Sequence, residues 1–253
     1  MNRKNKITIK TPEEIQIMRE AGRILAGIIE ELKCSLKSGM TTKEIDSLAE
    51  KLINDRQVIA AFKGYRGFPG CACISVNHEV VHGIPGDYVV KDGDIVSVDV
   101  GIIYKEYYSD TAITIPVGQV STEVQRLLDV TKTSLAKGIE KAQVDNRLFD
   151  ISHAIQKHIE RNHFSVVREF VGHGIGRQLH EDPEIPNFGS PHQGPVLEEG
   201  MVFAIEPMVN MGSRETKILN DGWTVVTKDG QFSAHFEHSV AITRNGPEIL
   251  TQC

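Results

Sequence analysis

Residues 97–111, SVDVGIIYKEYYSDT, have the pattern of a β-hairpin, yet each of its two strands carries an aspartate. If the central Lys-Glu pair forms a two-residue turn, Gly101 lies opposite Asp110. Asp99 lies two residues from Gly101 and shares its face, so the two aspartates are diagonal neighbours whose side chains reach toward a common point. A one-residue change in the turn would place the acids on opposite faces, so this inference depends on the register.

The two faces of this hairpin differ in character. The face of the two aspartates otherwise holds Ser97, Gly101 and Ala112, small residues that we expect to leave room above the carboxylates. The other face is apolar and consists of Val98, Val100, Ile102, Ile113 and Ile115. The acids therefore lie together on the less apolar side of the hairpin.

Along the whole chain, the same order of predicted helices and strands occurs twice. Thr11 and Thr41 each begin a capping-box pattern that predicts a helix, and further helices are expected from Ser121 and over 148–161. Strands are predicted within 58–118 and over SVVREFVG (165–172), MVFAIEPMV (201–209), WTVVTKD (223–229) and EHSVAIT (237–243). The order helix, helix, strands thus occurs twice. We expect one α+β domain over 1–253, with halves of roughly 11–118 and 121–251, a cleft between their sheets and a short N-terminal arm over 1–10.

Composition limits the classes of function. The 253 residues are 40% apolar and 25% charged, and their net charge of −6 argues against a nucleic-acid-binding surface. No apolar run approaches the roughly 18 residues of a membrane span, and the basic N-terminus lacks the apolar core of a signal peptide. The cysteines Cys34, Cys71, Cys73 and Cys253 form no disulfide framework, which favours a reducing cytoplasm, and Cys71-x-Cys73 alone is a weak zinc signal.

Three further residues could join the two aspartates in a metal site. Glu206 follows a strand-like run, Glu237 precedes another, and His173 lies between glycines in VGHGIGR. A single acid at a strand end is more often a turn cap or a solvated residue, and a lone histidine is usually not a ligand. If the four acids converge, however, they repel one another unless cations neutralise them. Two divalent ions would do so, and this ligand set suits Mn, Fe, Co or Zn without choosing among them.

The chain resembles the type I methionine aminopeptidases in their short bacterial form. The matching stretches run from Thr11 to about Thr251 and are SVNHEVVHGIPG, GDIVSVDVGIIYKEYYSDTA, VGHGIGRQLHEDPEIPN, EEGMVFAIEPMV and DGWTVVTKDGQFSAHFEHSVAIT. The resemblance implies the pita-bread fold, two pseudo-symmetric α+β halves with a central curved, mainly antiparallel sheet flanked by helices. It also implies a site for two divalent metal ions. The zinc-finger extension of eukaryotic type I enzymes and the insertion of type II are not seen.

The resemblance assigns roles to individual residues. It implies that the metal ligands are Asp99, Asp110, His173, Glu206 and Glu237. Asp110 and Glu237 would bridge the ions, Asp99 would bind one of them, and His173 and Glu206 the other. A metal-bridging hydroxide would attack the first peptide bond, with Glu206 as the proton shuttle.

The substrate residues follow from the same resemblance. It places His82 and His180 beside the substrate, although alone they could be a turn histidine and a cap. It nominates a methionine pocket of Tyr65, Phe68, Cys73 and Trp223, with Phe62 and Leu179 at the rim. Three positions depart from the commonest pattern: Phe62 replaces a frequent cysteine, Leu179 a frequent aromatic residue and His235 a frequent glutamine. The role of His235 stays open.

The resemblance therefore predicts a cytoplasmic, monomeric hydrolase that removes the initiator methionine from peptides and nascent chains when the second residue is small. The ribosome is a candidate partner, whereas DNA and membranes are not. One alternative is an X-Pro peptidase of the same fold, although such enzymes usually carry an additional N-terminal domain and only eleven residues precede the first helix here. A non-catalytic pita-bread binding protein should have lost ligands, and a calcium module would not combine two histidines with an apolar pocket.

Overall fold

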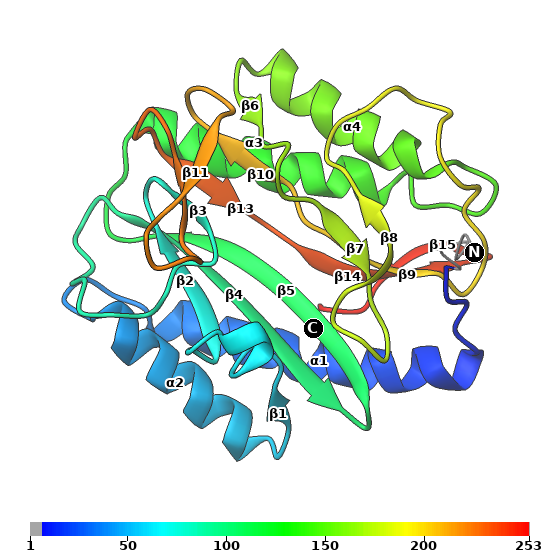
Figure 1. Cartoon of the computed structure of the whole chain (residues 1–253), viewed down its shortest axis with the longest axis horizontal. Coiled ribbons are helices and arrows are strands. Elements are labelled where there is room, and N and C mark those ends of the chain that lie inside the picture. Colours follow the sequence, from blue (N-terminus) through cyan, green and yellow to red (C-terminus); the bar gives the residue numbers. More distant parts are fainter. Residues whose placement is uncertain (1–6, 253) are drawn as a thin grey trace.

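The computed structural model describes residues 7–252, so most of the expected N-terminal arm, residues 1–6, lies outside this range. Four α-helices occur in it (Figure 1): α1 Pro12–Ser35, α2 Thr42–Asp55, α3 Thr122–Ile139 and α4 Leu148–Arg161. Thr11 and Thr41 close the predicted capping boxes, and the Ser121 hydroxyl accepts a hydrogen bond from the backbone N–H of Val124. Three of these helices therefore begin where their capping residues predict, and α4 covers the range 148–161 that its apolar periodicity predicts.

The central hairpin has the predicted register. β4 (Ile95–Tyr104) pairs with β5 (Tyr107–Pro116), Tyr104 lies opposite Tyr107, and Gly101 lies opposite Asp110. Both turn residues have positive φ angles, 47° and 68°, as a type I′ turn requires. The other edge of β4 pairs with β2 (Ala72–Val76) and β1 (Ile59–Ala60), which completes a four-stranded antiparallel sheet.

The remaining strands form three further antiparallel sheets in the described range. The largest contains, in spatial order, β15 (Gly246–Ile249), β14 (His238–Thr243), β9 (Val202–Ile205), β7 (Gly172–Gly174) and β8 (Glu181–Ile185). A second contains β13 (Ser233–His235), β10 (Met208–Asn210) and β6 (Ser165–Val166). The third contains β11 (Thr216–Ile218), β12 (Val225–Thr227) and β3 (Glu79–Val81), and a short 3₁₀ turn covers Tyr65–Gly67.

Two predicted strands are each divided between two sheets. The expected strand 165–172 was wrong as a single element, because β6 ends at Val166 and β7 begins at Gly172 in another sheet. The expected strand 201–209 breaks between β9 and β10 at Glu206-Pro207. Pro207 has no N–H and cannot continue the hydrogen-bonded ladder. As a result, Glu206 lies at the point where the chain passes from one sheet to the next.

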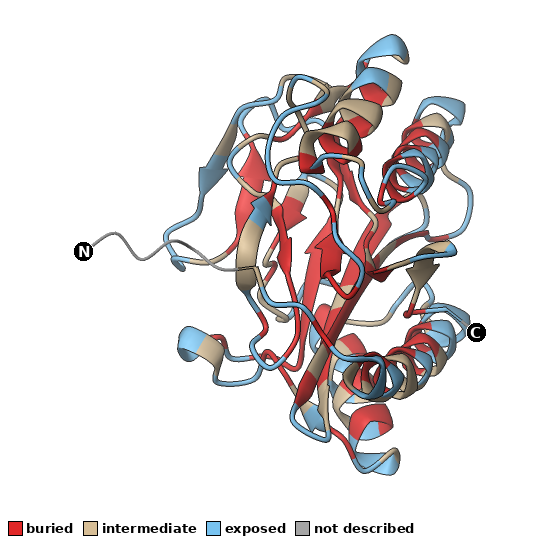
Figure 2. Ribbon diagram, turned by 90° about the vertical axis from the view of Figure 1, so that its right-hand side faces the viewer, coloured by how far each residue is buried: buried red, intermediate tan, exposed pale blue. Residues whose placement is uncertain are grey.

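The helices lie on one side of the strands, and buried residues fill the layer between them (Figure 2). Each half has its own hydrophobic cluster, and a third cluster joins them through residues that include Met18 and Tyr107 from the first half and Leu179 and Val202 from the second. The two halves therefore share a continuous core. Within residues 7–252 no helix combines the length and the apolar character needed to span a lipid bilayer.

Candidate metal centre and active site

Asp99 and Asp110 lie on the same face of the hairpin, as the register requires. Each carboxyl group shifts the pKa of the other, and Oδ1 of each is buried without a hydrogen-bond partner among the described residues. The register also pairs Cys73 of β2 with Asp99, so the thiol lies on this face. Gly101 does not leave the expected space for an ion. A Cβ atom there would lie 2.6 Å from the Phe62 ring, so the glycine accommodates Phe62 instead.

Glu237 reaches this face because the segment between β13 and β14 runs along β5. The backbone N–H of Glu237 donates to the carbonyl of Ala112 at 2.9 Å, and the Thr111 hydroxyl donates to the carbonyl of Glu237 at 2.6 Å. Ser239 and Asp110 exchange two hydrogen bonds beside them. This docking places the Glu237 carboxylate next to Asp110, although 127 positions separate the two residues in sequence.

His173 enters the site from β7, where glycines permit close packing of the backbone. A Cβ atom at Gly172 would lie 2.3 Å from the carbonyl oxygen of Ala204, so only glycine fits. Nδ1 of His173 lies 2.9 Å from the carbonyl oxygen of Gly174 and donates to it when it carries the proton. Nε2 then has a free lone pair, the form in which imidazole binds metals.

The five predicted ligands surround one point. One ligand atom each of Asp110, His173 and Glu237 lies within 4.8 Å of the others. Glu206 adjoins this group through the 3.5 Å distance between its Oε1 and Nε2 of His173, and Asp99 adjoins it through Asp110. The chain thus brings all five together, with Asp99 and Glu206 on the flanks of the central three.

The electrostatics of this cluster favour cations. Burial raises the pKa of Asp99 to about 7 and, together with the neighbouring carboxylates, raises the pKa values of Asp110, Glu206 and Glu237 well above their ordinary range. Burial and the nearby His180 lower the pKa of His173 to about 3, so its imidazole is neutral. Within residues 7–252, buried oxygens of Asp99, Asp110 and Glu237 have no hydrogen-bond partner. Oxygen atoms with unused lone pairs, beside a neutral imidazole, fit divalent metal ions.

Without bound metal, the free energy of unfolding of the chain should decrease as the pH rises above about 7. Unfolded carboxyl groups titrate near pH 4, whereas burial raises the pKa of Asp99 to about 7 and shifts the pKa values of Asp110, Glu206 and Glu237 in the same direction. Unfolded histidines titrate near 6.5, and burial lowers the pKa of His173 to about 3, so above pH 7 this imidazole is largely neutral in both states. The folded state therefore binds more protons than the unfolded state, and the free energy of unfolding decreases by up to about 1.4 kcal/mol per pH unit for each such proton.

Urea unfolding of the chelated protein at about pH 7 and about pH 8 measures this slope. Saturating Mn²⁺ should raise the stability most at the higher pH, because the carboxylates are then ionised for binding. A metal-free stability that stays constant or increases over this range would contradict the raised pKa values.

The cluster opens into a small cavity of about 140 Å³. Its wall contains the five predicted ligands and every predicted substrate residue: Phe62, Tyr65, Phe68, Cys73, His82, Leu179, His180 and Trp223. The rings of Phe68 and Trp223 meet edge to face with centroids 5.2 Å apart. Arg66 also lines the cavity and was not predicted; only its place beside Tyr65 could have indicated it. A small cavity that combines apolar and aromatic side chains with metal-binding groups suits a single apolar side chain.

The two predicted substrate histidines of the cavity are held differently. Nδ1 of His180 lies 2.9 Å from the Tyr65 hydroxyl, and partial burial lowers the pKa of His180. His82 has a left-handed backbone with φ of 59° and packs edge to face on Trp223, with centroids 6.2 Å apart. Burial lowers the pKa of His82 to about 4. Strained backbone at a non-glycine residue is often found at functional sites.

His235, whose role the sequence left open, lies directly behind the cluster. It is 2% exposed, and its Nε2 lies 3.7 Å from Oε2 of Glu206. Burial and the nearby His82 lower the pKa of His235 to about 3. The histidine therefore contacts a predicted ligand without reaching the cavity wall that the described residues form.

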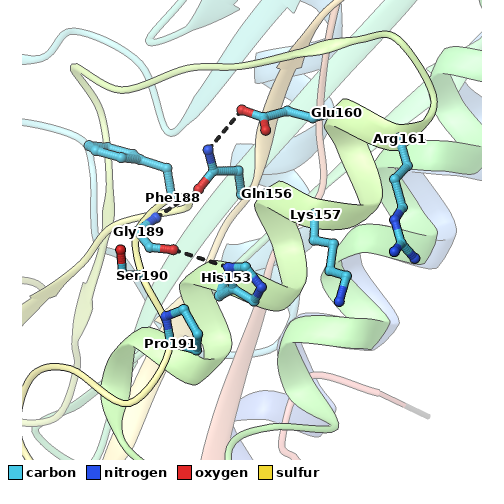
Figure 3. Close-up of a pocket in the computed structure, with 9 residues that line it drawn as sticks. All are labelled: His153, Gln156, Lys157, Glu160, Arg161, Phe188, Gly189, Ser190 and Pro191. Atoms are coloured by element: carbon cyan, nitrogen blue, oxygen red, sulfur yellow. Dashed lines mark hydrogen bonds between the residues drawn. The ribbon is translucent and has the colours of Figure 1, made fainter.

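A larger groove of about 780 Å³ lies elsewhere, between α4 and the loop 188–191 (Figure 3). Gln156 accepts a hydrogen bond from the backbone of Gly189 and donates another to Glu160, and His153 bonds to the carbonyl of Gly189. The polar groups of this groove thus largely satisfy one another. None of the predicted site residues lines it, and its size alone indicates no chemistry.

Comparison with known proteins identifies the family. The sequence model of metallopeptidase family M24 matches residues 16–244, a range that contains the five clustered ligands and the cavity wall. The chain belongs to metallopeptidase family M24. Membership explains why acids and histidines from strands far apart in sequence meet at one cavity.

Relatives named methionine aminopeptidases match the chain over nearly its whole length. The chain is 56% identical to methionine aminopeptidase 1 of Bacillus subtilis strain 168 over 246 residues, which cover 97% of this chain and 99% of the relative. The crystal structure of the methionine aminopeptidase of Thermotoga maritima superposes with a TM-score of 0.96 at 46% identity and covers 98% of this chain and 100% of that one. The predicted resemblance and pita-bread fold are confirmed.

The similarity to X-Pro enzymes of family M24 is limited to the fold. The prolidase of Pyrococcus furiosus superposes with a TM-score of 0.77 at 24% identity, and the match covers 97% of this chain but 65% of the prolidase. At this identity the comparison shows a common architecture and no common substrate. The alternative of an X-Pro peptidase therefore has no support beyond the shared fold.

Proposed function

We propose that this chain removes the N-terminal methionine from peptides and proteins by metal-dependent hydrolysis of the first peptide bond. One observation carries the proposal: the five clustered residues and a set of apolar and aromatic side chains line the same small cavity, so a side chain bound in the cavity brings its own backbone close to the cluster. Similarity to methionine aminopeptidases over nearly the whole chain supports the same activity.

The cluster would hold two divalent ions. Asp99, Asp110, His173, Glu206 and Glu237 would hold them; one ligand atom each of Asp110, His173 and Glu237 lies within 4.8 Å of the others, and Glu206 lies 3.5 Å from His173. When bound, such ions lower the pKa of water toward neutrality and polarise a carbonyl group. The repulsion among the carboxylates, which raises their pKa values without metal, is relieved by the added charge.

The protein's own residues position the substrate and move its protons. Tyr65, Phe68, Cys73 and Trp223 receive the flexible, polarizable methionine side chain and exclude water. Glu206, beside His173, takes the proton of the attacking water and returns it to the leaving amine. If the Tyr65 hydroxyl donates to Nδ1 of His180, Nε2 of His180 carries a proton that can stabilise the carbonyl oxygen. His82 contacts the substrate backbone from the opposite wall.

We also propose the physiological substrate, partner, location and oligomeric state of the chain. Nascent chains with a small second residue are the expected physiological substrates, and the ribosome is a candidate partner. The chain acts in the cytoplasm as a monomer. Its two halves work as one catalytic domain, a proposal supported by the hydrophobic cluster that they share.

A peptide assay tests the function. The purified chain, supplied with Mn²⁺, Fe²⁺ or Co²⁺, should release methionine from a Met-Ala peptide and release it more slowly from a Met-Lys peptide. An Ala-Pro peptide is the control for the X-Pro alternative and should remain intact. Failure to cleave Met-Ala with every metal, despite a folded chain, would favour a non-catalytic binding protein, and equal rates on Met-Ala and Met-Lys would refute the preference for a small second residue.

A further inference from the structure

His235 is buried beside Glu206 on the side that faces away from the cavity. Its Nε2 lies 3.7 Å from Oε2 of Glu206, whereas Oε1 of Glu206 lies 3.5 Å from Nε2 of His173. The two oxygens of one carboxylate thus face two different imidazoles. Nε2 of His235 is buried and has no hydrogen-bond partner among residues 7–252, and Glu206 is the acid next to it.

The backbone of His235 is held from two sides. Its N–H donates to the Thr114 hydroxyl at 2.9 Å, and that hydroxyl donates back to the His235 carbonyl at 2.8 Å. Ser97, on the adjacent strand, hydrogen-bonds the same Thr114 hydroxyl at 2.8 Å. On its other side His235 pairs with Met208 of β10. β5 and β10 therefore fix the position from which the imidazole approaches Glu206.

We propose that His235 is a positioning residue that holds Oε2 of Glu206 through a hydrogen bond from Nε2, so that Oε1 stays directed at the metal side of the site. The 3.7 Å separation needs to shorten by less than 1 Å to reach ordinary hydrogen-bond length, which a small rotation of the carboxylate provides. Groups that orient a ligand or a catalytic carboxylate from behind affect metal affinity and activity together. The inference extends the proposed function, because it concerns the residue assigned as proton shuttle.

Two substitutions separate a hydrogen-bonding role from a packing role. His235→Gln keeps a side-chain N–H at about the reach of Nε2, whereas His235→Leu fills the space and removes the donor. We expect His235→Leu to lower kcat for a Met-Ala peptide and the affinity for Mn²⁺ by about 10- to 100-fold, with KM within about threefold. His235→Gln should retain both quantities within about threefold, which a merely structural histidine would not predict.

His238→Gln is the matched control. His238 is a half-buried histidine three positions further along the chain. Its Nδ1 lies 2.9 Å from the Thr251 hydroxyl and not beside Glu206. Its substitution should leave kcat unchanged. If His235→Leu does not fold, His235→Asn replaces it, because the shorter amide falls short of Glu206 and should show the same loss.

Calorimetric titration of the metal-free variants with Mn²⁺ gives a readout that does not depend on turnover. Equal losses in His235→Gln and His235→Leu, or Mn²⁺ affinity and kcat within threefold of the parent in His235→Leu, would overturn the proposal. An inactive parent chain would count against the proposed function, while the Mn²⁺ affinities would still decide the role of His235.

Discussion

Asp110→Asn should reduce kcat/KM for a Met-Ala peptide by on the order of a hundredfold to a thousandfold, because it removes a central charge that would hold both metal ions. The same substitution should stabilise the metal-free protein near pH 8. Asp110 is 5% exposed and lies beside three other buried acids, so a neutral amide of the same size removes repulsion. Loss of activity with a gain in metal-free stability is the signature of a metal ligand and not of a structural aspartate.

The measurement combines peptide kinetics with urea unfolding of the chelated protein. Asp129→Asn is the control, because Asp129 is exposed on α3 and contacts Gln125 far from the cluster. Both quantities should be unchanged in that variant. A metal-free Asp110→Asn protein that is less stable than the parent would show that the carboxylate supports the fold by itself.

His180→Ala should lower kcat by about a hundredfold or more while leaving the affinity for Mn²⁺ within about threefold. His180 lines the cavity, and its ring lies 4.3 Å from that of His173, but its Nδ1 is engaged by the Tyr65 hydroxyl. It is therefore placed to contact the substrate and not to complete the metal cluster. The loss should appear mainly in kcat, since the hydrogen bond strengthens as charge develops on the carbonyl oxygen.

His153→Ala provides the comparison for that variant. His153 is a partly buried histidine on α4 in the separate groove of Figure 3, so its loss should leave both kcat and metal affinity unchanged. If His180→Ala lost Mn²⁺ binding in proportion to activity, His180 would have to be reassigned as a ligand. If it kept full activity, the assigned role in the reaction would be wrong.

The predicted features that depended on neighbours in sequence were confirmed. The helix starts at Thr11 and Thr41 follow from capping patterns of four residues, and the pairing of Asp99 and Asp110 on one face follows from a two-residue turn. Two expectations failed, one for a local reason and one because of a contact between residues distant in sequence. Pro207 ended a ladder that its apolar neighbours would have continued, and the Phe62 ring occupies the space above Gly101. Neither outcome follows from periodicity.

The sequence by itself determined the hairpin, its register and the identity of the acids and histidines, because strand alternation and turn type are set by adjacent residues. The resemblance to a known family supplied their assembly into one site. Only the tertiary structure decided how they meet: Glu237 docks along β5, and Glu206 lies where the chain changes sheets. It also placed His235 behind Glu206. The docking of Glu237 on β5 joins residues more than a hundred positions apart, and no local pattern predicts such a contact.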